Sequence, residues 1–125
     1  MNKQKVFLLV ASIGLFPIAL SYGAAPGQSL SALFSFSVDT VNETHIFRAV
    51  MGLYLAFVVF WLMGVKDDKL TRPAIMGLVV FMLGLALGRS LSLLVDGPAH
   101  WLLMAYALIE YLFAFVGIRL LKSEK

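Results

Sequence analysis

Cysteine is absent from this chain of 125 residues, and charge is scarce, at 14% of residues. Without cysteine there can be no disulfide, thiolate catalysis, iron–sulfur cluster or thiolate zinc site. A soluble domain would carry about 25% charged residues, whereas 61% of this chain is hydrophobic. The composition therefore predicts an all-α integral membrane protein, with residues 1–125 forming a single domain.

Four apolar runs are each close to the roughly 20 residues with which a helix crosses a bilayer. They cover residues 6–25, 46–65, 73–95 and 101–121. A cleaved signal peptide is the rival interpretation of the first run, because Gly23-Ala24-Ala25 resembles a cleavage site. Thr40 and Glu43 fit a capping box that starts the second helix near Val41, and Pro73 suits the first turn of the third. The predicted fold is a four-transmembrane-helix bundle.

The basic residues predict an orientation with both termini in the cytoplasm, because lysine and arginine favour cytoplasmic loops. Eight of the ten would then lie inside: Lys3, Lys5, Lys66, Lys69, Arg72, Arg119, Lys122 and Lys125. Trp61 would lie near the inner interface and Trp101 near the outer one, as in an aromatic belt. Since this pattern accounts for the net charge of +3, no nucleic-acid partner is predicted.

Two charged residues, Arg89 and Glu110, lie inside apolar runs. Glu110 follows Trp101 by nine residues, about 14 Å below the outer interface, and Arg89 precedes Asp96 by seven, about 10 Å below it. A short turn between the two spans makes them antiparallel neighbours, which predicts an Arg89–Glu110 ion pair. A charge at the helix centre costs about 2.5–3.5 kcal/mol on insertion scales. One interpretation is that the pair fixes helix register and does nothing more.

The other interpretation is a polar pocket around the pair, open to the outer side. Helical spacing places His45 on the face of Arg48, and Ser92 and Asp96 on the face of Arg89. The candidate pocket residues are Asn42, His45, Arg48, Arg89, Ser92, Asp96 and Glu110. No tight ligand spacing such as His-x-x-x-His is present, so neither a metal ion nor another cofactor is predicted.

Small residues predict close helix packing. Gly84 and Gly88 form a small-xxx-small motif, for which contact within the bundle is favoured over a homodimer face. A similar stripe in the fourth run consists of Ala107, Ala114 and Gly117. Residues 29–36 are apolar but too short to cross a membrane, so we expect a short interfacial segment over the mouth of the bundle.

Two sequence blocks resemble a known family. One begins Asn42-x-x-His45-Ile46-Phe47-Arg48, and the other contains Gly84-Leu85-Ala86-Leu87-Gly88-Arg89-x-Leu91-Ser92-x-x-x-Asp96-Gly97. With Glu110 they resemble the small bacterial four-span proteins catalogued as domain of unknown function four-three-four-five and, more distantly, the DoxX-like proteins. The resemblance implies a four-helix bundle in a bacterial inner membrane and no particular reaction. The thiol role linked to some DoxX-like proteins does not carry over, because cysteine is absent.

Three functions remain open at this point. The first is binding of an amphipathic lipid, quinone or isoprenoid whose polar head meets Arg48 and Arg89, with an enzymatic version in which Glu110 or His45 acts as acid or base. The second is an accessory or structural subunit, with a homo-oligomeric or other membrane partner. The third is a proton-coupled transporter resembling the small multidrug exporters, although their key glutamate lies in the first span and lacks an arginine partner.

Overall fold

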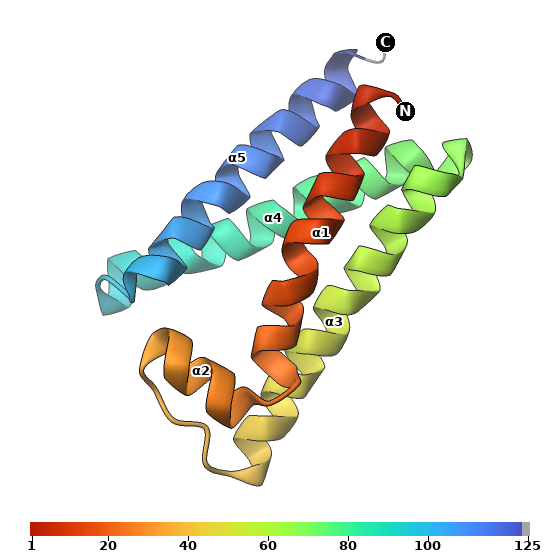
Figure 1. Cartoon of the computed structure of the whole chain (residues 1–125). Helices are drawn as coiled ribbons and strands as arrows, with labels where there is room; N and C mark the ends of the chain where they lie inside the picture. The colour runs from red at the N-terminus through yellow and green to blue at the C-terminus, as the bar shows by residue number, and fades with distance from the viewer. Residues whose placement is uncertain (124–125) are drawn as a thin grey trace.

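The computed structural model describes residues 1–123 as five helices, with no strand in that range (Figure 1). The helices are α1 (Lys3–Gly23), α2 (Pro26–Phe34), α3 (Val41–Lys66), α4 (Asp68–Asp96) and α5 (Trp101–Ser123). All except α2 are long and apolar enough to cross a membrane, which confirms the predicted all-α, four-span architecture. Lys125, counted above among the basic residues, lies outside the described residues.

The helices α3 and α4 both start at polar caps. The Thr40 hydroxyl accepts a hydrogen bond from the backbone N–H of Glu43 at 3.1 Å, and the Glu43 carboxylate accepts from the Thr40 N–H at 3.0 Å, which is the predicted capping box. The prediction that Pro73 occupies the first turn of its helix is wrong. Asp67 caps α4 by accepting from the N–H of Lys69 at 2.9 Å, so the helix begins at Asp68 and Pro73 falls in its second turn.

The cap of α3 gives a first testable prediction. Thr40→Ala should lower the free energy of unfolding by about 0.5–2 kcal/mol, because it leaves the first-turn N–H of Glu43 without its acceptor. Thermal unfolding in detergent would measure the loss. Ser37→Ala is a suitable control, since Ser37 lies exposed just before the cap. Equal melting temperatures for the two variants would contradict a stabilising role for the cap.

The four long helices form two pairs that are joined at one end of the bundle. α1 packs mainly along α3 and α5 along α4, and the pairs meet where α3 turns into α4. At this end, called the turn end, a Cβ on Gly64 would lie only 2.6 Å from the Ala74 Cβ, and Lys5 forms an ion pair with Asp68 at 2.5 Å. The N-terminus and the end of α5 also lie at the turn end, and α2 lies at the opposite end (Figure 1).

Trp61 belongs to the core of the turn half of the bundle and is not an interfacial anchor. Its side chain is fully buried and meets Phe81 edge-on at 5.6 Å between ring centroids. The predicted belt position was therefore wrong for Trp61, because its ring faces α4 and not the lipid. Trp101 is 71% exposed. The predicted short apolar segment exists as the helix α2, which starts three residues earlier than expected.

The two small-residue stripes behave differently. The α5 stripe is buried within the bundle as predicted, and a Cβ on Gly117 would meet Val79 at 2.5 Å. The favoured packing of Gly84 and Gly88 against another helix was wrong, because a Cβ on either would find no atom within 4 Å. α3 and α4 diverge from the turn end, so the helix that could have covered these glycines does not reach them (Figure 1).

Candidate functional site

The predicted ion pair between Arg89 and Glu110 is present. The Nε of Arg89 lies 3.0 Å from one carboxylate oxygen of Glu110 and 3.2 Å from the other. The two side chains are 20% and 9% exposed, respectively. The pair thus joins α4 to α5 in a poorly hydrated setting where opposite charges attract strongly.

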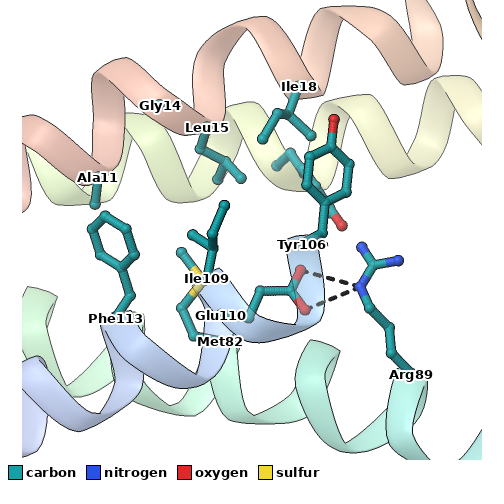
Figure 2. Close-up of a pocket in the computed structure, with 11 residues that line it drawn as sticks. Ala11, Gly14, Leu15, Ile18, Met82, Arg89, Tyr106, Ile109, Glu110 and Phe113 are labelled. Carbon is teal, nitrogen blue, oxygen red and sulfur yellow. Dashed lines mark hydrogen bonds and ion pairs between the residues drawn. The ribbon is translucent and has the colours of Figure 1, made fainter. Parts of the chain in front are cut away.

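The pair leaves most of the guanidinium unused. An arginine has five N–H donors, and only the one on Nε is directed at Glu110. Within residues 1–123, neither terminal nitrogen is directed at Glu110, and Tyr22 is the neighbouring side chain that interacts with the guanidinium as a hydrogen-bond partner. Its hydroxyl could accept from one of the donors at most. The ring of Tyr106 lies 5.6 Å from the guanidinium carbon, and Figure 2 shows both side chains at the same end of the cavity.

A cavity of about 270 Å³ opens beside this pair and is called the Arg89 cavity. Leu15 and Ile18 of α1 and Phe113 of α5 give it apolar walls, while Tyr54, Tyr106, Arg89 and Glu110 contribute its polar groups. Figure 2 shows Arg89 and Tyr106 at one end and Ala11 and Phe113 at the other. A cavity that is apolar along its length and polar at one end matches the shape of an amphipathic molecule.

Three tyrosines around Arg89 were missed by the sequence interpretation. Tyr22 and Tyr54 meet edge-on at 5.4 Å, and both lie on the α1–α3 side of the guanidinium, opposite Tyr106 on α5. Phe34 of α2 packs against the Tyr106 ring at 6.4 Å. The sequence could have identified these tyrosines by their hydroxyl groups, since a tyrosine within an apolar span brings a polar atom to membrane depth.

The single polar funnel predicted from the sequence is not present. Arg48 donates to the backbone oxygen of Gly23 at 3.0 Å and, with His45, lines a separate surface hollow. Asn42 is exposed at the start of α3. Helical spacing placed His45 and Arg48 on one face correctly. That face meets the end of α1 at Gly23 and the residues just before α3, and not Arg89.

Ser92 and Asp96 also stand apart from Glu110. The Ser92 hydroxyl donates to the Asp96 carboxylate at 2.7 Å, and both residues are exposed near the end of α4. Of the predicted pocket residues, the Arg89 cavity contains only Arg89 and Glu110, while Ser92 lines a second hollow together with Arg89, as its place on the same helix face predicted. Among residues 1–123, no three histidine or acidic side chains lie close enough to hold a metal ion.

Four apolar spans with a buried charged pair define a multi-pass helical membrane protein. Residues 3–121 match the family described as domain of unknown function (DUF4345), and the chain belongs to that family. No curated protein and no solved structure matches the chain.

Proposed function

We propose that this protein binds a small amphipathic or lipid-like molecule within the bilayer. The polar end of the molecule would meet Arg89 and its apolar part would occupy the Arg89 cavity. The proposal includes the predicted orientation in a bacterial inner membrane, in which the α2 end faces outward and both termini face the cytoplasm. Arg48 is not part of the proposed site, because its guanidinium is held at Gly23.

The unused donors of Arg89 are the observation that carries this proposal. Arg89 lines two hollows, and a polar group within hydrocarbon favours a hydrogen-bond partner, so a bound acceptor beside Arg89 would be stabilised by the donors that Glu110 leaves free. If the Arg89–Glu110 pair served only to fix helix register, we would expect the terminal nitrogens of Arg89 to donate to Glu110 as well. The transporter alternative receives less support, because a glutamate held by an arginine is a poor site for an organic cation.

Cavity filling tests the proposal. A Cβ on Gly14, which lines the Arg89 cavity, would meet no atom within 4 Å, so Gly14→Leu should fill the cavity without forcing the helices apart. We expect native mass spectrometry of gently purified wild-type protein to show a reproducible bound molecule, and Gly14→Leu and Arg89→Ala to lower its occupancy about tenfold, equivalent to 1.4 kcal/mol.

Gly52→Leu is the matched control, because Gly52 also has open space beside it but lines neither the Arg89 cavity nor another described hollow. It should keep wild-type occupancy. Arg89→Ala also disturbs the ion pair, so the result for Gly14→Leu is decisive if Arg89→Ala fails to fold. Wild-type occupancy in Gly14→Leu, or wild-type protein carrying only the bulk lipids of its membrane, would overturn the proposal.

A further inference from the structure

A second hollow reaches the same arginine from the other side. It measures about 550 Å³ and lies between the diverging halves of α3 and α4, so we call it the α3–α4 groove. Val50 and Leu53 of α3 and Gly84 and Gly88 of α4 are among its lining residues. Tyr54 and Arg89 line both the groove and the Arg89 cavity. These two side chains therefore stand where the two spaces adjoin.

The size of the Arg89 cavity limits what it can hold alone. At about 270 Å³ it lies just below the range of about 300–1,000 Å³ typical of sites for drug-sized ligands. It can take a short apolar group but not a long acyl chain. A lipid-like ligand with its polar group at Arg89 would therefore need a second space for its chain, and the groove is the space that begins at the same residue.

The charges of the site indicate which kind of polar group the ligand carries. Arg89 and Glu110 carry opposite charges and together are neutral, and Arg48 lies in a separate hollow. An anionic head group would gain from Arg89 but would meet the Glu110 carboxylate beside it. An uncharged group with oxygen acceptors, such as an ester or another carbonyl, can accept from the terminal nitrogens of Arg89 without that repulsion.

We infer that the ligand is an uncharged, acceptor-bearing lipid whose polar group and the short part next to it occupy the Arg89 cavity beside Arg89, and whose long chain continues into the α3–α4 groove. This inference rests on the proposed function and extends it to a second compartment and a chemical class. Gly84 keeps the groove open, because any larger side chain there would project into the space that the chain needs.

The test uses three probes of graded size and charge on the full-length protein in nanodiscs. Monobutyrin is an uncharged ester with a short chain, mono-olein is its long-chain counterpart, and oleate is an anion with the same chain. Occupancy would be measured by native mass spectrometry for the wild type, Gly84→Leu, Gly14→Leu and the control Gly52→Leu. Neither Gly84 nor Gly52 has an atom within 4 Å of an added Cβ, so both variants should fold.

We expect Gly84→Leu to lower mono-olein occupancy at least tenfold and to leave monobutyrin within twofold of wild type. Gly14→Leu should lower both, Gly52→Leu neither, and oleate should bind wild type at least tenfold more weakly than mono-olein. Unchanged mono-olein binding in Gly84→Leu would overturn the groove part of the inference, and tighter binding of oleate would overturn the uncharged head group; both results would leave the proposed binding at the Arg89 cavity intact. Failure of both esters to bind wild type would overturn this inference, whereas the proposed function fails only if wild-type protein carries no specifically bound molecule, as in the test above.

Discussion

Glu110→Leu should lower the free energy of unfolding by about 3–5 kcal/mol, because it leaves the Arg89 charge buried without a partner. The Arg89 side chain is only 20% exposed, so water cannot fully replace the lost carboxylate. The double variant Arg89→Met/Glu110→Leu should recover most of the loss, since apolar residues of similar volume often replace a buried ion pair at little cost. Unfolding in mixed micelles of Glu110→Leu, Arg89→Met and the double variant would complete a double-mutant cycle.

The double variant also separates stability from binding. If the pair only fixes helix register, a folded double variant has lost nothing of functional importance. If the site binds a ligand as proposed, the double variant should be folded yet empty, because the donors of Arg89 are gone. Arg119→Met is a control for loss of an arginine, since Arg119 is exposed near the end of α5. A double variant less stable than either single variant would contradict the expected coupling.

Gly64→Ala should be the most harmful of the small substitutions, with a loss of about 1–3 kcal/mol from overpacking. The added methyl would lie 2.6 Å from the Ala74 Cβ, 3.0 Å from a Leu8 methyl and 3.2 Å from the Leu70 carbonyl. Two of these neighbours cannot move without shifting α4 itself. Because α3 and α4 meet here, the shift would spread along the diverging helices toward Arg89. Thermal unfolding in detergent would measure the loss.

Gly52→Ala is the matched control for this prediction. The same substitution in the same helix meets no atom within 4 Å and should be neutral or stabilising by up to about 1 kcal/mol, because alanine is the better helix former. A Gly64→Ala variant as stable as Gly52→Ala would show that α3 and α4 approach each other less closely at the turn end than the structure has it.

Local chemistry made several features predictable from the sequence. The box formed by Thr40 and Glu43 starts α3 because the two residues satisfy each other's backbone groups, whatever surrounds them. The Arg89–Glu110 pair was predictable because a short turn fixes the relative depth of two neighbouring helices. Both predictions depend on residues close in sequence or linked by a tight connection, for which helix geometry alone is sufficient.

Features that depend on the angle between distant helices could not be predicted. The depth of Arg48 suggested that it shares a site with Arg89, but the packing of α3 against α1 directs it to Gly23. Gly84 and Gly88 were expected to be packed, but α3 and α4 diverge before reaching them. Tryptophan is a residue type common in aromatic belts, and only the packing of Trp61 against Phe81 shows that it belongs to the core. Sequence periodicity identifies a face but not what that face meets.

The order of Arg89 and Glu110 along the chain has a consequence for biosynthesis. The arginine leaves the ribosome 21 residues before the glutamate, so α4 is synthesised before its counter-charge exists. A lone arginine within a span hinders its release into lipid, with a cost that reaches about 2.5–3.5 kcal/mol at the helix centre. We therefore expect α4 to wait at the translocon until α5 emerges. The two helices would then enter the membrane together as a hairpin, with the charges already paired.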